Sequence, residues 1–199
     1  MPAMSTSLSF TDDFESVPLL FEKCIQVDVF AFKNNKSVAE TLAHSRYAKL
    51  KESTLANYRN ALNQPLGEFL LSLKDSGDEY YKRFLNKYGD LKYSKFFLAD
   101  STFYDLKGVY AYFQKDRLMY IGRCRDSMKK RINQGYGKIH PKNCYIDGQA
   151  TNCHLNALIT KVRNHISLKL HVMESNEEIE KLENQLIREL SPPWNIQNR

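Results

Sequence analysis

The sequence predicts an α+β protein, with a small, mostly antiparallel sheet of three strands flanked by helices and preceded by a mainly α-helical N-terminal region. Three observations lead to this fold class. Helical signals dominate between residues 35 and 90. After Lys107, β-rich runs and amphipathic helices alternate in the order β-β-α-α-β-α. The change in texture near Lys107 divides the chain into two parts, residues 1–95 and residues 100–199.

The N-terminal part begins with one short strand, because Ile25, Val27 and Val29 alternate with polar residues. Its helices are indicated by local start signals. One example is the capping box formed by Ser37 and Glu40, whose side chains can satisfy each other's free backbone N–H groups. The helical segments expected here run from Ser37 through His44, from Ser53 or Thr54 through Leu62, from Pro65 through Leu73, and from Asp78 through Tyr88.

The C-terminal part opens with a β-hairpin, in which the runs Gly108–Gln114 and Arg117–Ile121 are joined by Lys115-Asp116. A helix follows, which Asp126 can cap and which ends at Gly135. The remaining segments are a loop over 135–149, a helix over 152–165, a half-buried strand over 166–172, and a last helix that the capping box Ser175–Glu178 opens and Pro192-Pro193 ends.

The composition suits a globular protein with a polyanionic partner. With 42% hydrophobic and 26% charged residues, the chain differs from disordered sequences. Lys and Arg number 29 against 23 Asp and Glu, which gives a net charge of +6 and a pI near 9.0. Because phosphate neutralisation dominates non-specific affinity for nucleic acids, this excess favours a nucleic-acid partner. By itself it is weak support, since many basic proteins bind no nucleic acid.

The sequence shows no export signal and no apolar run near the ~20 residues that a membrane span requires. We therefore expect a cytoplasmic protein that does not enter membranes and whose four cysteines stay reduced. His140, Cys144, Cys153 and His154 could in principle gather a zinc ion, but their irregular spacing makes this the weaker alternative.

Hydrolysis of a phosphodiester needs a base that activates water, a cation that stabilises charge on the phosphate, and a carboxylate that holds any metal ion. The C-terminal part offers candidates for each role. Tyr110 and Tyr120 lie on the two hairpin strands, Arg131 on the next helix, and Glu183 at the border of the apolar stripe of the last helix. Each residue alone has an ordinary explanation as packing or as a solvated charge. Spacing therefore suggests a site without establishing it.

Several motifs surround these candidates in a fixed order. Gly108-Val109-Tyr110 is followed, after nine residues, by Tyr120-Ile121-Gly122. A basic stretch over 123–131 ends in Arg131. Leu182-Glu183-Asn184-Gln185-Leu186-Ile187-Arg188 then precedes Pro192-Pro193-Trp194-Asn195. Together, over residues 108–195, these motifs resemble those of the GIY-YIG nuclease family, whose fold and endonuclease activity the chain is therefore expected to share.

The resemblance implies a role for each matched residue. Tyr110 would be the general base that deprotonates water, and Tyr120 its partner, orienting the water or the scissile phosphate. Arg131 would stabilise the negative charge of the transition state, a bidentate task for which guanidinium is suited. Glu183 would hold a single divalent metal ion, Mg²⁺ or Mn²⁺, against a phosphate oxygen. Asn195 would order the site or a phosphate.

The chain departs from the family's pattern at two positions. Lys usually follows the Tyr-Ile-Gly triplet, and here the residue is Arg123, which keeps the charge but changes its reach. The family often has His or Tyr four residues after the catalytic Arg. Here that position is Gly135, with Tyr136 one residue later and His140 as a second candidate for the role. The base, the Arg and the metal ligand are all present, so we expect an active enzyme.

The expected partner is double-stranded DNA. The loop over 133–152, dense in Gly, Asn and Gln, is either a DNA-contacting loop or a simple surface loop. The N-terminal part is a candidate DNA-recognition module, either through a loose helix-turn-helix or as a plain helical bundle. The candidate DNA-binding residues are Arg125, Lys129, Lys130, Lys138 and Asn152.

A restriction or defence nuclease is the leading expectation. A homing endonuclease and a DNase toxin would share its chemistry, and a non-catalytic DNA-binding regulator on the same fold is the rival from another class. Cleavage of RNA and pairing of two subunits as a homodimer for double-strand cleavage are both left open by the sequence.

Overall fold

Residues 13–32 and 36–196 are described by the computed structural model, and the chain folds into two units. The sheet unit takes its described residues from Met1–Glu22, Phe96–Gly137 and Lys161–Arg199. The helical unit comprises the described residues of Lys23–Lys95 and Lys138–Thr160. The expected parts, residues 1–95 and 100–199, do not contain the same segments as these units, because each unit takes segments from both halves of the sequence. Target recognition by the first part and chemistry by the second stay predictions.

The sheet unit is built on a four-stranded antiparallel sheet with the order β1-β6-β4-β5. β4 (Gly108–Gln114) and β5 (Arg117–Cys124) form the predicted hairpin, with Lys115 at a φ of 55° in its turn. β6 (Ile166–Val172) pairs with the whole of β4, as the alternation of its residues predicts. β1 (Glu15–Val17) adds a fourth strand beside β6 where three were expected. A run of three residues is too short for alternation to reveal it.

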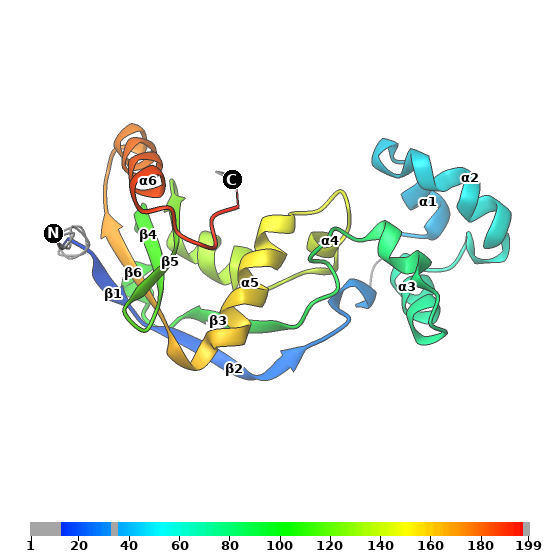
Figure 1. The fold of residues 1–199 in the computed structure, drawn as a ribbon, viewed down its shortest axis with the longest axis horizontal. Helices are drawn as coiled ribbons and strands as arrows, with labels where there is room; N and C mark the ends of the chain where they lie inside the picture. The colour runs from blue at the N-terminus through cyan, green and yellow to red at the C-terminus, as the bar shows by residue number, and fades with distance from the viewer. Residues whose placement is uncertain (1–12, 33–35, 197–199) are drawn as a thin grey trace, which may run out of the picture. The chain divides into compact units, whose positions relative to one another are not determined.

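Helix α6 (Asn176–Leu190) packs against β4 and β5 (Figure 1). Ser175 caps this helix as predicted, since its hydroxyl accepts the backbone N–H of Glu178 at 3.3 Å. The helix ends before the two prolines at Ser191, which has a φ of 44°. The buried residues that α6 shares with one face of the sheet are Val109, Ala111, Phe113, Ile121, Ile179, Leu186 and Ile187.

A π-helix, Lys129–Tyr136, occupies the place where an ordinary helix ending at Gly135 was expected. The backbone N–H of Gly137 donates to the carbonyl of Ile132, five residues earlier, at 2.6 Å. Asp126 does not cap this helix as predicted, because its carboxylate accepts the N–H of the adjacent Ser127 at 2.8 Å.

A second, two-stranded sheet pairs β2 (Leu19–Gln26) with β3 (Tyr93–Leu98). The strand expected around Ile25 is thus shifted toward the N-terminus, and Val29 begins a 3-10 turn instead. β3 was not predicted, because no strand was expected between the helical segment that ends at Tyr88 and the run that begins at Gly108. Its backbone is held locally by Asn156 of α5 (Ala150–Val162), whose buried amide exchanges hydrogen bonds of 3.1 and 2.8 Å with the backbone of Ser94.

The start signals of the helical unit are mostly confirmed. Ser37 and Glu40 form the predicted capping box, with hydrogen bonds of 2.7 and 3.2 Å. The second helix begins earlier than expected, and Thr54 lies in its interior, where its hydroxyl donates to the carbonyl of Leu50 at 2.7 Å. Asp78 caps only a 3-10 helix. The described helices of this unit besides α5 are α1 (Val38–Leu42), α2 (Ala48–Asn57), α3 (Leu66–Asp75), α4 (Pro141–Cys144), and the 3-10 helices Val29–Ala31, Ser45–Tyr47, Arg59–Ala61 and Glu79–Phe84.

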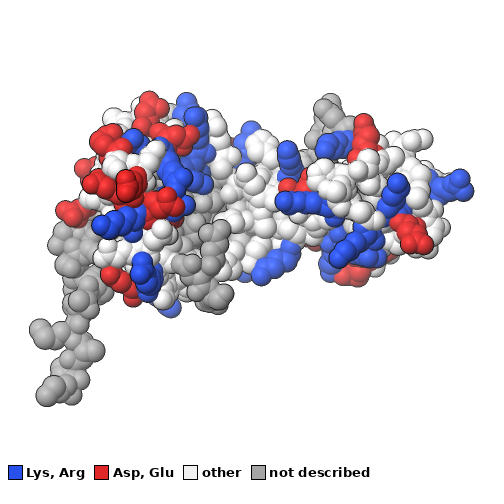
Figure 2. Space-filling model, turned by 90° about the horizontal axis from the view of Figure 1, so that it is seen from above, with Lys and Arg blue, Asp and Glu red and all other residues white. Residues whose placement is uncertain are grey.

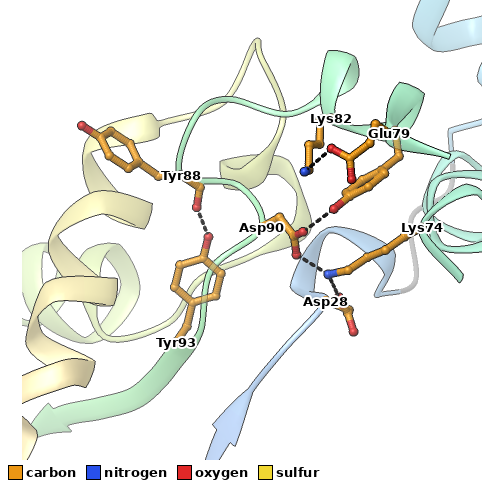
Figure 3. Close-up of polar contacts among 8 residues, drawn as sticks. Asp28, Lys74, Glu79, Lys82, Tyr88, Asp90 and Tyr93 are labelled. Atoms are coloured by element: carbon orange, nitrogen blue, oxygen red, sulfur yellow. Dashed lines mark hydrogen bonds and ion pairs between the residues drawn. The ribbon is translucent and has the colours of Figure 1, made fainter. Parts of the chain in front are cut away.

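A polar network ties three segments of the helical unit together. The ammonium of Lys74 on α3 lies 2.6 Å from carboxylate oxygens of both Asp28 and Asp90, and the hydroxyl of Tyr81 donates to Asp90 at 2.7 Å (Figure 3). Burial lowers the pKa of Lys74, but the two carboxylates raise it by more. Each charge in this network is therefore paired, which is typical of a structural contact.

None of the helices within the described residues has both the length and the apolar character that crossing a membrane requires.

Candidate active site

Three tyrosine hydroxyls meet in the sheet unit. Tyr110 of β4 donates to the hydroxyl of Tyr136 at 3.0 Å, and the hydroxyls of Tyr120 and Tyr136 lie 3.4 Å apart. Tyr110 is fully buried, Tyr136 is 3% exposed and Tyr120 is 9% exposed. We call these three residues the tyrosine cluster. It brings both hairpin strands and the end of the π-helix to one point.

Gly122 makes room for this cluster. It lies opposite Tyr110 in the β4–β5 register, and a Cβ at this position would lie 2.5 Å from the Tyr110 hydroxyl oxygen and 2.8 Å from the ring of Tyr120. Any side chain at position 122 would therefore displace the two tyrosines. The glycine of the second motif is required by the close approach of their rings.

The π-helix explains how Tyr136 reaches the cluster. Tyr136 follows Arg131 by five residues, whereas an α-helix places residues four apart on neighbouring turns of one face. In a π-helix the hydrogen bonds join residues five apart, so that residues i and i+5 become neighbours along the axis. The guanidinium carbon of Arg131 accordingly lies 5.9 Å from the centre of the Tyr136 ring. Tyr136 thus lies beside Arg131 despite the glycine at position 135.

Arg131 has the environment of an anion-binding residue. Its side chain is half-buried, and within the described part of the chain it forms no ion pair with a carboxylate. Burial lowers the pKa of its guanidinium, the groups around it (Tyr110, Tyr136, Cys124 and Tyr120) together raise it by more, and an arginine stays protonated in proteins in any case. The positive charge of Arg131 is therefore retained beside the cluster and is available to a phosphate.

Burial governs the ionisation of the two hairpin tyrosines. It raises the pKa of Tyr110 and Tyr120 well above its ordinary value, and the neighbouring Tyr136 raises it further. The positive charge of Arg131 acts in the opposite direction on both groups. Both hydroxyls are consequently protonated at neutral pH, and forming a phenolate requires additional positive charge or a proton acceptor at the site.

Glu183 of α6 lies at the edge of β5 in an ionic network. Its side chain is 13% exposed, and its carboxylate accepts a 2.5 Å hydrogen bond from the Arg123 guanidinium. The same guanidinium lies 3.2 Å from Glu180, one helical turn before Glu183, and Arg125 lies 2.6 Å from Glu180. Burial raises the pKa of Glu183, and the charges of Arg123 and Arg131 oppose the rise.

The carboxylates at this edge fit the ligand set of a magnesium site. Mg²⁺ is usually held by one or two carboxylates, with water and substrate phosphates completing its shell. Glu183 and Glu180 supply that number. Within residues 13–32 and 36–196, no group of three or more His, Cys, Asp or Glu is arranged to hold a metal ion. The zinc site considered for His140, Cys144, Cys153 and His154 is therefore not formed among these residues. All four cysteines are free thiols.

Asn195 fastens the C-terminal segment to the edge strand. Its side-chain oxygen accepts the N–H of Ile121 at 3.0 Å, and its side-chain nitrogen donates to the carbonyl of the same residue at 2.8 Å. The N–H of Trp194 also donates to the carbonyl of Met119 at 2.9 Å. These bonds fix the backbone on both sides of Tyr120.

The candidate DNA-binding residues fall into two groups. In the sheet unit, Arg125 pairs with Glu180, Lys129 lies 4.9 Å from the centre of the Tyr104 ring, and Lys130 lies 3.2 Å from Asp126. On the face drawn in Figure 2, lysine and arginine side chains lie among acidic ones. In the helical unit, Lys138 is exposed, and Asn152 donates to the side chain of Gln149 at 2.7 Å. His140, the second candidate for the role considered for Tyr136, is also exposed and belongs to this unit.

Sequence reasoning missed two residues of this region. Tyr112 is fully buried beside Tyr110 and Tyr120, with ring centres 6.1 and 6.3 Å away, and its hydroxyl has no hydrogen-bond partner in the described structure. Its position two residues after Tyr110 on a strand could have revealed that the two side chains share a face. Glu180 could have been found from its spacing of three residues before Glu183 on a helix.

Comparison with known proteins finds similarity over half of the chain. No family model matches the chain, and no solved structure matches it. UvrABC system protein C of Flavobacterium psychrophilum is 32% identical over 100 residues, which are 50% of this chain and 14% of that protein. The proteins of the same name from Flavobacterium johnsoniae and Helicobacter acinonychis are 32% identical over 96 residues and 34% identical over 90 residues. These alignments cover 48% and 45% of this chain, and again 14% of each relative.

Proposed function

We propose that the chain is a metal-dependent endonuclease that hydrolyses phosphodiester bonds of double-stranded DNA at the tyrosine cluster. The observation that carries this proposal is that the cluster lies beside Arg131, which forms no ion pair with a carboxylate among the described residues, and that Tyr120 interacts electrostatically with the largely buried Glu183. The motif resemblance to the GIY-YIG family supports the same conclusion. So does the similarity of half of the chain to proteins named UvrABC system protein C.

In this proposal, each residue acts on a different part of the reaction. Tyr110 first loses its own proton to solvent and then, as the phenolate, accepts a proton from the attacking water, while Tyr120 orients that water or the phosphate. Arg131 donates hydrogen bonds to the phosphate as its charge grows in the transition state. Mg²⁺ or Mn²⁺, when bound, would supply Lewis-acid stabilisation of that charge. Glu183 would hold the ion, with Glu180 as the second carboxylate.

One observation favours a second assignment of the base. Tyr110 is fully buried, while Tyr120 is 9% exposed and interacts electrostatically with Glu183. An attacking water reaches Tyr120 more directly. The alternative is therefore that Tyr120 is the base and that Tyr110, which is hydrogen-bonded to Tyr136, orients it.

Arg123 has a defined position in this scheme. Its guanidinium neutralises Glu183 in the structure, and a divalent cation at the same carboxylate must compete with it. Once released, a guanidinium at this edge can bind a phosphate oxygen. Arg123 thereby replaces the lysine that is usual in the family and supplies both a counter-charge for the empty carboxylate and a phosphate ligand.

Within this activity, we propose a restriction or defence role, with residues 1–95 contributing to the choice of target. The cytoplasmic location and the pairing of two chains stay predictions. The rival function is that of a DNA-binding regulator without catalytic activity. Incubation of the purified chain with plasmid DNA and Mg²⁺ distinguishes the two, because only the enzyme nicks the plasmid.

The replacement Glu183→Ala tests the metal ligand. We expect DNA binding within about twofold of wild type and cleavage reduced by more than about 100-fold, because the carboxylate acts on the rate and not on affinity. Glu189→Ala, on the exposed side of the same helix, is the matched control and should cleave like wild type. Gel shifts and plasmid nicking on the same preparations measure both quantities. Cleavage by Glu183→Ala within about tenfold of wild type, ~1.4 kcal/mol in barrier, would show that another group holds the metal.

A further inference from the structure

The helical unit contains a pocket of about 410 Å³ that shares no residue with the tyrosine cluster. Its volume lies within the range of about 300–1,000 Å³ that is usual for small-molecule sites. It is formed between the segment that carries α1 and the segment that carries α4, both of which belong to this unit. None of its residues has a role in the proposed cleavage reaction.

The floor of the pocket is buried, aromatic and fixed in position. Tyr47, Leu66 and Tyr145 are 2%, 1% and 4% exposed. The hydroxyl of Tyr47 donates to the carboxylate of Asp147 at 2.5 Å, and the hydroxyl of Tyr145 donates to the carbonyl of Phe30 at 2.6 Å. Burial and the bond to Asp147 raise the pKa of Tyr47, so that it remains a donor. With both hydroxyls occupied, the floor presents apolar surface to a ligand.

The rim of the pocket is basic. Lys36, His44, His140 and Lys142 line it, and all four side chains are exposed. Lys142 has no ion-pair partner within the described residues. The Nδ1 atom of His44 accepts the N–H of Arg46 at 3.3 Å, which leaves Nε2 for another partner. The only carboxylate that lines the pocket in the described structure is Asp147, and Tyr47 already binds it.

We propose that this pocket binds a nucleotide, with the base against the apolar floor and the phosphate at the basic rim. A free phosphate would leave the floor uncovered, and an uncharged aromatic ring would leave Lys142 without a counter-charge. A nucleotide satisfies both surfaces. It can come from solution as a mononucleotide, or from a nucleic-acid strand as a base turned out of its stack. The inference does not depend on the proposed cleavage, because binding needs no divalent cation.

Titration of the full-length, isotope-labelled chain by NMR tests the proposal in the absence of divalent cations. The ligands are the four deoxynucleoside monophosphates, the corresponding deoxynucleosides, and inorganic phosphate. We expect saturable shifts at residues of the pocket with at least one monophosphate, at least about tenfold tighter than with its nucleoside or with phosphate alone. A second arm uses a duplex with one unpaired base and its fully paired equivalent. If the unpaired base binds the pocket and mononucleotides do not, the nucleotide comes from a strand.

A pair of lysine variants separates the pocket from general charge. Lys142→Ala removes a rim charge, whereas Lys92→Ala removes an exposed charge of the same unit that does not line the pocket. We expect about tenfold weaker nucleotide binding for the first variant and a change within about twofold for the second. Equal losses for both variants overturn the proposal, because they would show attraction by net charge. It is also overturned if phosphate alone binds as tightly as the nucleotides, or if neither arm shifts residues of the pocket.

Discussion

Replacing Tyr110 by phenylalanine removes one hydroxyl from the tyrosine cluster and keeps the ring that fills the space beside Gly122. The lost contact is the 3.0 Å hydrogen bond to Tyr136. A buried hydrogen bond between neutral groups contributes about 0.5–1.5 kcal/mol of net stability, so unfolding should be easier by about 1 kcal/mol. General-base assistance contributes roughly 10²–10⁴-fold in rate, which is about 3–5 kcal/mol of barrier. The effect on cleavage should therefore exceed the effect on stability severalfold.

Tyr112→Phe is the matched control for this experiment. Tyr112 is as buried as Tyr110, lies on the same strand, and has a hydroxyl without a hydrogen-bond partner in the described structure. Removing an unsatisfied buried hydroxyl should leave stability unchanged or raise it slightly, and cleavage should stay within about twofold of wild type. Urea unfolding and single-turnover cleavage with Mg²⁺ measure the two quantities on each variant.

The reasoning is refuted if Tyr110→Phe cleaves as fast as Tyr112→Phe at neutral and mildly alkaline pH. The base would then not be Tyr110. The same pair of measurements on Tyr120→Phe would decide whether the roles of the two hairpin tyrosines are exchanged. A loss of stability by Tyr110→Phe that accounts for its whole loss of activity would equally contradict a catalytic role.

Three further predictions concern the same site. Burial holds the pKa of both Tyr110 and Tyr120 well above the ordinary value of a tyrosine. The single-turnover rate of DNA cleavage should therefore rise about tenfold per pH unit between about pH 7 and 9, and a flat profile would contradict a tyrosine base. Gly122→Ala places a Cβ 2.5 Å from the Tyr110 hydroxyl, so urea unfolding should show a loss of about 1–3 kcal/mol, with cleavage impaired; wild-type stability would show that the rings can move apart. Arg123→Ala removes the competitor of a cation at Glu183, and calorimetric titration should show tighter binding of Mn²⁺; weaker binding would mean that Arg123 supports the metal site.

The parts of the fold that the sequence predicts best are those with strong local signals. The hairpin β4–β5 follows from two β-rich runs separated by two residues. Strand β6 follows from alternation, and α6 from a capping serine, an apolar stripe and a pair of prolines. In each case the residues that specify the element lie within it or next to it. Tyr110, Tyr120 and Glu183 could be located for that reason.

The parts that were missed depend on partners distant in the sequence. β1 exists through its pairing with β6, for example between Glu15 and Leu170, and its three residues carry no pattern of their own. Helix α5 was expected, but an apolar stripe does not reveal which core it joins. Its Cys153 and Ala157 belong to the hydrophobic core of the helical unit, together with Tyr145 from the preceding segment. Local sequence patterns therefore could not show which segments of the chain belong to each unit.

Tyr136 shows how a local irregularity can decide a site. Sequence spacing left its role doubtful, because an α-helix after Arg131 would direct position 135 toward the hairpin, and that residue is glycine. The π-helix adds one residue to the turn and places the Tyr136 hydroxyl between those of Tyr110 and Tyr120. The N–H of Gly137 donates the last hydrogen bond of this helix, to the carbonyl of Ile132. At this point the backbone passes so close to Phe96 that a Cβ at position 137 would lie 2.0 Å from the Phe96 carbonyl oxygen. The departure from the family's spacing and the departure from α-helical geometry thus compensate each other. This compensation is why Tyr136 belongs to the tyrosine cluster, although motif spacing alone left its role open.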